Sequence, residues 1–138
     1  MAQFLGKFRG KVVSNVDPQQ VGRVQVNVPD AGSVTAFALP CFPPGMFAVP
    51  AIGASVWVEF EQGDVEHPIW SGVFYPAATD VPAAAKQLPQ GQSGVAIGVD
   101  GGLVLQGGSL ASLSNSGGAT LTMTASSVDV NGGAFVVI

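Results

Sequence analysis

The side chains that could support catalysis are few and widely spaced in this sequence of 138 residues. His67 is the only histidine, and it follows a Gly-Asp turn signal. A protein zinc site needs three or four ligands, so a single histidine excludes a His-rich metal centre within one chain, although three chains could bring three copies together; we expect a solvent-exposed loop residue. Cys41 is also alone, which excludes a disulfide within the chain and a thiolate cluster. We expect Cys41 to be a small buried hydrophobe between its apolar neighbours.

A pair of carboxylates for glycoside hydrolysis would have to come from one short acidic stretch, which contains Glu59, Glu61, Asp64 and Glu66. Glu59 and Glu61 share one face of a predicted strand, and we interpret that face as a solvated outer surface. The tail contains Ser112, Ser114 and Ser116, but no histidine and no G-x-S-x-G setting. We therefore predict that the protein is not an enzyme, and we predict no catalytic residue, no cofactor and no metal site.

The first 76 residues contain several short apolar/polar alternations that turn signals separate. Valines alternate in Arg23-Val24-Gln25-Val26-Asn27-Val28, and the prolines and glycines that follow end this run. The predicted strands cover Lys7–Val16, Gly22–Val28, Phe37–Leu39, Ala54–Glu61 and Pro68–Tyr75. Five short strands without a convincing helix indicate an all-β fold with a small barrel of the OB type.

The composition changes near Gln87. Beyond residue 89 the chain has no Lys, Arg, Glu or Pro, and its only charged side chains are Asp100 and Asp129. Apolar residues recur at every second position, which indicates strands with one buried face, and glycine doublets separate the runs.

A tail of about 45 residues is too short to bury such a face by itself. The high hydrophobic content of 47% and the mean hydropathy of +0.42 also suggest that apolar surface is buried between subunits. Several identical chains must therefore share one core in a β-prism. The residues that we assign to this core are Val95, Ile97, Val99, Leu103, Leu105, Leu121, Met123, Val128 and Val130.

Charge and hydropathy argue against other classes of partner. The net charge is −4, and the five basic residues form no stripe of the kind that nucleic-acid binding proteins show. Met1–Val13 has no continuous apolar core of a signal peptide, and no stretch reaches the length of about 18 apolar residues that a membrane-spanning helix needs. We expect synthesis in the cytoplasm without a signal peptide.

The residues of the first part also carry a family resemblance. The matching runs are Gly10–Pro18 (GKVVSNVDP), Gly22–Val26 (GRVQV), Pro50–Asp64 (PAIGASVWVEFEQGD), His67-Pro68 and Gly72–Tyr75 (GVFY). In this order and spacing they resemble the OB domain of contractile-tail spike proteins, the family of phage baseplate assembly protein V and of type VI secretion spikes. The resemblance covers about 65 residues.

This resemblance implies a structural role. It implies a homotrimer in which residues 1–76 form an OB collar on the baseplate hub proteins, 77–92 form a linker, and 93–138 form an intertwined triple-stranded β-helix, a needle that helps to puncture the target envelope. The expected location is the baseplate of a virion tail or a related injection particle, and the outer membrane is met only on puncturing. The alternative is an OB-fold binding module for an oligosaccharide or single-stranded nucleic acid.

The C-terminal end departs from the family pattern, in which two histidines bind iron at the tip. This chain ends in Phe135, Val136, Val137 and Ile138. An apolar end predicts either a docking platform for a separate tip protein or residues that close the prism by packing on each other.

Overall fold

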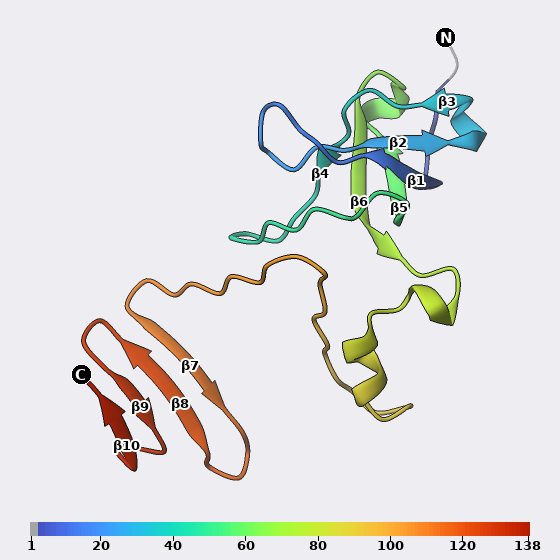
Figure 1. Cartoon of the computed structure of the whole chain (residues 1–138). Helices are drawn as coiled ribbons and strands as arrows, with labels where there is room; N and C mark the ends of the chain where they lie inside the picture. Colours follow the sequence, from blue (N-terminus) through green and yellow to red (C-terminus); the bar gives the residue numbers. More distant parts are fainter. Residues whose placement is uncertain (1–2) are drawn as a thin grey trace. The chain divides into compact units, whose positions relative to one another are not determined.

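The computed structural model describes residues 3–138, apart from the side chains of Val136 and Val137, and it divides into two compact units, 1–81 and 82–138. Every strand in both units belongs to a β-sheet, and the only helical pieces in the described chain are short 3₁₀ turns (Figure 1). Among the described residues, no helix is both long enough and apolar enough to cross a membrane.

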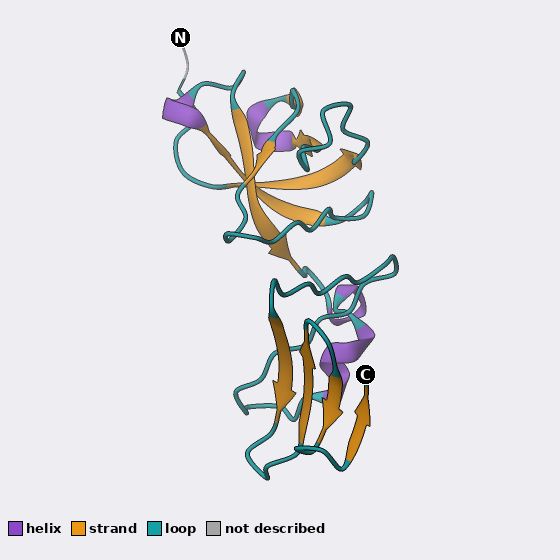
Figure 2. Cartoon of the chain, turned by 90° about the vertical axis from the view of Figure 1, so that its left-hand side faces the viewer, coloured by secondary structure: helices purple, strands orange, loops and turns teal. Residues whose placement is uncertain are grey.

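The first unit is a curled six-stranded sheet with the strand order β3-β2-β1-β5-β6-β4. Its strands are β1 (Phe8–Ser14), β2 (Gln25–Val28), β3 (Ser33–Val34), β4 (Leu39–Pro40), β5 (Ser55–Phe60) and β6 (Pro68–Phe74). A bridge between Val24 and Ala38 joins the start of β2 to the segment before β4, so the sheet curls round on itself (Figure 2). Two 3₁₀ turns, η1 (Pro29–Ala31) and η2 (Glu61–Gly63), follow β2 and β5.

The four longer strands agree with the alternation in the sequence. Val56, Val58 and Phe60 of β5 are buried, whereas Trp57 and Glu59 between them are only half-buried. The valines of the second run, 24, 26 and 28, all have 0% exposure. The predicted facing of both runs is therefore confirmed. The two-residue strand β3 was not predicted, because a segment that short shows no period.

The core of this unit is made of valines and aromatic rings. Its buried members are Val12, Val24, Val26, Val28, Ala38, Val56, Val58, Phe60 and Trp70. The indole Nε1–H of Trp70 donates a hydrogen bond of 3.0 Å to the carbonyl of Gly22, so the one polar atom of this ring is satisfied inside the core. Gly10 lies in β1 where a Cβ atom would collide with the side chain of Val26, which explains the glycine in the middle of a strand.

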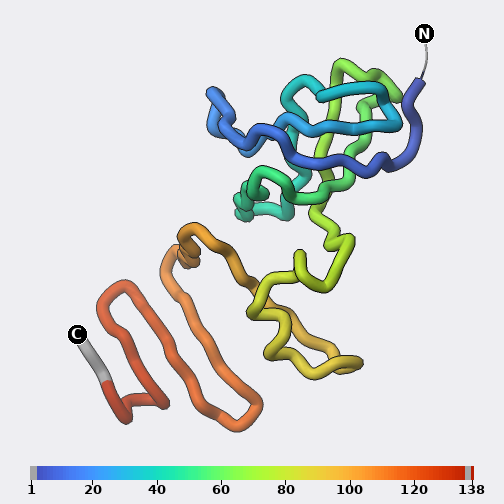
Figure 3. Tube along the Cα trace, turned by 45° about the vertical axis from the view of Figure 1, so that its right-hand side comes forward, coloured from blue at the N-terminus to red at the C-terminus, as the bar shows by residue number. Residues whose placement is uncertain are grey.

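The second unit contains a four-stranded antiparallel sheet with the order β10-β9-β8-β7. Its strands are β7 (Leu110–Ser114), β8 (Thr120–Thr124), β9 (Val128–Val130) and β10 (Phe135–Val137). The chain folds back and forth through these strands, as the orange and red part of Figure 3 shows. Before the sheet, the unit has a 3₁₀ turn, η4 (Ala83–Gln87), and an extended segment; a further 3₁₀ turn, η3 (Ala78–Asp80), ends the first unit.

Each pair of strands in this second sheet is adjacent in sequence, so one chain forms the whole sheet. The predicted β-helix is a structure of three chains, and it remains a proposal. No strand is formed within 93–109, although Val95, Ile97 and Val99 alternate there.

Candidate functional site

The single histidine is paired with a nearby carboxylate in a surface turn. The ring Nδ1 of His67 lies 2.9 Å from Oδ2 of Asp64, and both side chains are largely exposed. The backbone N–H of Glu66 and the ring of His67 hold the pKa of Asp64 below its ordinary value, so this contact stabilises a turn. The prediction of an exposed loop histidine is confirmed.

Glu59 and Glu61 do not form a catalytic pair with each other in the described structure. Glu59 is 3.5 Å from Nζ of Lys7 on the outer face of the barrel, and Glu61 is exposed. In residues 3–138 no three His, Cys, Asp or Glu side chains lie close enough to share a metal ion.

The prediction for Cys41 is wrong, because its side chain is exposed. The backbone N–H of Cys41 bonds to the carbonyl of Trp70, which continues the pairing of β4 with β6. Phe42 then packs edge-on against Trp70 with ring centroids 5.3 Å apart and takes the inward position. Successive residues of an extended chain point to opposite sides, so Cys41 faces solvent.

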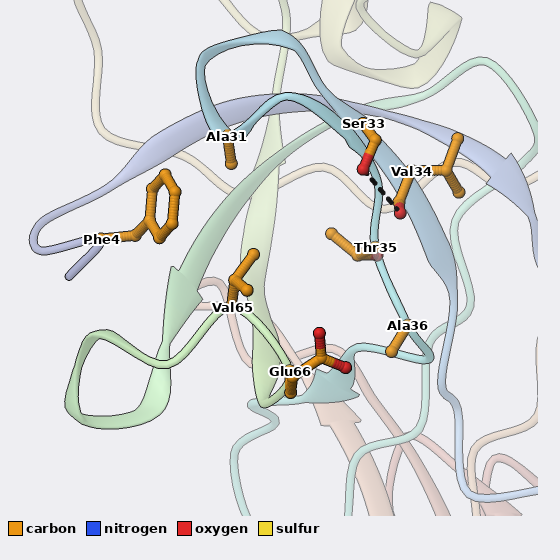
Figure 4. A pocket seen from close by; sticks show the side chains of 8 residues that line it. All are labelled: Phe4, Ala31, Ser33, Val34, Thr35, Ala36, Val65 and Glu66. Atoms are coloured by element: carbon orange, nitrogen blue, oxygen red, sulfur yellow. Dashed lines mark hydrogen bonds between the residues drawn. The ribbon is translucent and has the colours of Figure 1, made fainter. Parts of the chain in front are cut away.

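A hollow of about 300 Å³ lies between the N-terminal segment, the chain around β3 and the loop from η2 to β6 (Figure 4). It is lined by Phe4, Ala31, Ser33, Val34, Thr35, Ala36, Val65 and Glu66. The hydroxyl of Thr35 already accepts the N–H of Val26, and the Ser33 hydroxyl lies 3.5 Å from the carbonyl of Val34. Glu66 is the only ionisable residue in the lining, so this hollow presents no set of groups that could perform acid/base or nucleophilic chemistry.

The Asp17 loop explains two of the motifs that carried the resemblance. The Asp17 carboxylate accepts hydrogen bonds from the backbone N–H groups of Gln19, Val21 and Arg23, and from Nε and Nη2 of Arg23. The Arg23 guanidinium and these N–H groups hold the pKa of Asp17 well below its usual range. The guanidinium also lies 4.6 Å from the ring centroid of Phe37. These residues fix a loop and face no ligand pocket.

One cluster on the barrel was missed in the sequence. Arg9 of β1 places its guanidinium 5.5 Å from the Trp57 ring and 5.3 Å from the Phe74 ring, and the two rings are 4.5 Å apart. The three residues lie on three strands, so no single strand shows the pattern. The signal that could have found the cluster is the antiparallel pairing of β1 with β5, which sets Arg9 directly opposite Trp57.

Exposed apolar side chains gather on two loops at one end of the barrel. The loops contact each other: Asn15 Nδ2 donates to the carbonyl of Pro50 at 3.1 Å, and Gly22 lies against the Phe47 ring. The exposed members are Val16, Val21, Met46, Phe47, Val49 and Ile52, which we call the loop patch. Between Asp30 and Glu59 the sequence has no charged residue, so the longer loop adds no charge to this patch.

The sheet of the second unit has one apolar and one mainly polar face. Directly opposed residues share a face, and the register aligns Leu113, Leu121, Val130 and Phe135 in one row across all four strands. A second row aligns Ala111, Met123 and Val128 with the position of Val137. On the other face Ser112 and Thr122 approach through their hydroxyls at 3.4 Å, and Asp129 is next in that row. We call the face that carries the two apolar rows the apolar face.

Four of the nine predicted core residues lie together on this apolar face, namely Leu121, Met123, Val128 and Val130. Their exposure remains considerable, at 36% for Leu121 and 44% for Met123. The other five, Val95, Ile97, Val99, Leu103 and Leu105, lie in the extended segment and are exposed. Ala111, Leu113 and Phe135 belong to the face but were not assigned to the core. Leu113 was overlooked because Leu110 and Leu113 are three residues apart and break the alternation.

After β9 the chain turns back and forms the last strand of the sheet, β10. Asn131, Gly132 and Gly133 have positive φ angles of 52°, 63° and 102°, and they turn the chain into β10, so the expected turn at this glycine doublet is confirmed. The Asp129 carboxylate accepts the N–H of Gly133, and the Asn131 side chain accepts the N–H of Thr120. Ile138 is 98% exposed. The predicted docking side chains of Val136 and Val137 lie outside the described residues.

Comparison with known families identifies the barrel. A comparison with curated proteins returned no match. Residues 8–75, which include all six strands of the first sheet, match the family described as the type VI secretion system/phage-baseplate injector OB domain. Residues 8–75 of this chain therefore belong to the injector OB domain family, as the motifs in the sequence indicated.

Proposed function

We propose that the protein is the non-enzymatic central spike of a contractile injection machine, a phage tail baseplate or a related particle. In this proposal three chains associate, residues 1–76 form a collar, 77–92 a linker, and 93–138 a β-helical needle that helps to puncture the target envelope. The injector OB domain supports the baseplate role, because its family belongs to baseplates and type VI secretion systems.

The observation that carries the proposal is the apolar face of the sheet formed by β7 to β10. A sheet with one apolar face is stable only when another element covers that face. Here Leu113 and Phe135, at the two ends of one row, are 64% and 63% exposed. A face of this kind marks a protein interface. Identical copies are the simplest cover, since each copy brings the same apolar row.

The barrel is the proposed contact with the baseplate hub proteins. Its loop patch is apolar, exposed and free of charge along the longer loop, which suits a protein surface better than a phosphate backbone. Phe135 to Ile138 are the proposed docking segment for a separate tip protein. The segment could both close the prism and dock a tip protein, because Phe135 lies on the apolar face and Ile138 follows the last strand.

A second candidate function is a binding module for an oligosaccharide or single-stranded nucleic acid. The cluster of Arg9, Trp57 and Phe74 on the outer face of the barrel favours it, because stacked rings and an arginine are used to bind bases and sugars. In this structure, however, the guanidinium of the chain itself lies over both rings. Binding that is abolished by Trp57→Ala, measured by titration with oligonucleotides and oligosaccharides, would establish this second function.

The molar mass in solution tests the spike proposal. Sedimentation of the whole chain should return about three times its mass of 13.9 kDa. A chain truncated after Gln92 should keep a folded barrel and lose tight trimer formation. A whole chain that sediments as a monomer would refute the needle.

A further inference from the structure

The chain doubles back on itself at the start of the second unit. After η4 it reverses, and the extended segment that follows runs beside the turn in the opposite direction (Figure 3). We call residues 82–88 the strap and residues 94–99 the first tail segment; both belong to the second compact unit. Within the strap, the N–H groups of Ala85 and Leu88 bond to the carbonyls of Pro82 and Ala85. The strap is therefore folded chain, although it lies within the proposed linker.

Two glycines of the first tail segment lie where the strap leaves little room for a side chain. A Cβ atom at Gly94 would lie 3.0 Å from the side chain of Leu88. A Cβ atom at Gly98 would lie 3.1 Å from Cβ of Pro82 and 3.2 Å from Cβ of Ala84. Neither glycine has a positive φ angle, so the backbone conformation itself does not require glycine there. The close approach of the strap explains both residues.

The first tail segment packs with its small residues toward the strap. Successive residues of an extended chain point to opposite sides, so Ala96 shares the strap side with the two glycines, and both Ala96 and Gly98 are half-buried. The large aliphatic side chains point the other way and are 85%, 61% and 57% exposed at Val95, Ile97 and Val99. A chain that packs on itself normally buries its large aliphatic residues, and here that order is reversed. The strap covers one side of the segment and leaves the aliphatic side open.

We propose that the strap fixes the orientation of the first tail segment and so presents the side of Val95, Ile97 and Val99 to the other copies of the chain. This inference rests on the proposed homotrimer, and it gives part of the linker a role that a spacer does not have. A free extended segment can turn either side toward a neighbour, because a slip of one residue exchanges the two sides. A segment that the strap holds presents only one.

The strap also lowers the entropic cost of assembly. Fixing the backbone of a single residue opposes an equilibrium by about tenfold. A segment that is already ordered on the strap meets this cost before the copies meet, whereas a free segment meets it on assembly. Loss of the strap should therefore weaken the trimer at least about tenfold.

A cysteine pair tests the contact of the strap with the segment in the whole chain. In a Cys41→Ser background, Ala84→Cys with Gly98→Cys brings two Cβ atoms near the distance of about 3.5–4.5 Å that a disulfide needs, once the strap gives by a few tenths of an ångström. Oxidation should produce an internal disulfide, measured by mass spectrometry and by the loss of free thiols. In the matched pair, Ala84→Cys with Val99→Cys, the second thiol lies on the exposed side and should form no internal disulfide. Equal yields from the two pairs would overturn the inference.

A replacement of the strap tests its part in assembly. A Gly/Ser chain of equal length in place of residues 82–88 keeps the span and removes the packing. On dilution this variant should dissociate at a protein concentration at least about tenfold above that of the parent, while the fluorescence of the barrel tryptophans stays unchanged. The same replacement of residues 89–92 keeps the strap and should sediment like the parent. Equal behaviour of the strap replacement and the parent would show that residues 82–88 are only a spacer.

The outcomes distinguish this inference from the proposed function. A trimeric Cys41→Ser parent whose Ala84→Cys and Gly98→Cys pair forms no internal disulfide would reject the strap and leave the spike proposal standing. A monomeric parent would reject the homotrimer, and with it the presentation of the aliphatic side to other copies. A trimeric parent with an internal disulfide in the first pair alone, and a weakened trimer after replacement of residues 82–88, supports the strap.

Discussion

The barrel and the C-terminal sheet use the same sequence pattern with different results. In the barrel, Val24, Val26 and Val28 alternate with polar residues and have 0% exposure. In the tail, Leu121 and Met123 alternate with threonines in the same way and remain 36% and 44% exposed. The comparison teaches that alternation specifies which side chains share a face, whereas burial of that face depends on what covers it. The curled sheet of the barrel covers itself, and an open sheet of four strands does not.

The largest expected effect comes from a charge on the uncovered face. Met123→Asp would place one carboxylate per copy in the proposed dry core, at a cost of several kcal/mol for each ion, so the trimer should dissociate while the barrel stays folded. The matched control is Thr122→Asp, because Thr122 lies on the polar face opposite Ser112 and Asp129. Sedimentation and circular dichroism measure both variants. Equal loss of mass in the two variants would refute the assigned facing.

A cavity in the barrel core should have a large effect that does not depend on protein concentration. Trp70→Ala removes a 4%-exposed ring and its hydrogen bond to Gly22, and such truncations cost about 3–5 kcal/mol. Trp57→Ala on the outer face should cost only about 1–2 kcal/mol, from its contacts with Phe74 and Arg9. Chemical denaturation of each variant measures the loss. If dilution lowered the denaturation midpoint of the barrel as it lowers that of the needle, the two regions would unfold as one cooperative unit.

How far the sequence predicts each region follows from this comparison. The barrel was predictable because its longer strands have a strict period, turns bound them, and motifs such as Asp17…Arg23 have a local cause, the hydrogen bonds between those two residues. The two-residue strand β3 escaped, because pairing and not local pattern creates it, whereas β4 overlaps the predicted strand Phe37–Leu39. The exposed position of Cys41 was missed for a related reason, since it is set by the inward place of Phe42 against Trp70.

In the tail, the sequence predicted residues of β8 and β9 and the turn into β10, but not β7. Leu110 and Leu113 fall on opposite faces of β7, so the strand shows no two-residue period, and only its register with β8 identifies it. The cluster of Arg9, Trp57 and Phe74 was invisible for the same reason, because each residue comes from a different strand. Contacts between strands carry information that a single run of residues does not contain.

A smaller effect should appear when the barrel is titrated with acid. The folded pKa of Asp17 lies below its ordinary value, so the ionised carboxylate stabilises the barrel above about pH 4, and this contribution is lost as the pH falls below that value toward the folded pKa. The unfolding temperature of the parent should therefore fall more steeply between pH 5 and about pH 2 than that of Asp17→Asn. Both tryptophans lie in the barrel, so tryptophan fluorescence follows this unit alone.

The exposed Asp30 provides the control for this titration. Asp30→Asn changes an exposed carboxylate of η1 and should follow the parent curve. If Asp17→Asn and the parent lose stability in parallel as the pH falls, the hydrogen bonds of Asp17 are not what acid removes. In the neutral range the loop of Asp17 should contribute equally to the whole chain and to a chain truncated after Gln92, because all its partners lie in the barrel.

The smallest effect on assembly should come from the last residue. Ile138 follows β10 and is 98% exposed, so its deletion removes no row of the apolar face and should leave the trimer mass and unfolding temperature unchanged. If the segment Phe135–Ile138 docks a tip protein, the same deletion should weaken capture of that protein by the assembled particle. Deletion of Phe135–Ile138 provides the contrast, because it also removes β10 and should lower the stability of the trimer. A full-strength trimer after the longer deletion would show that β10 adds nothing to the assembly and that the whole segment serves docking alone.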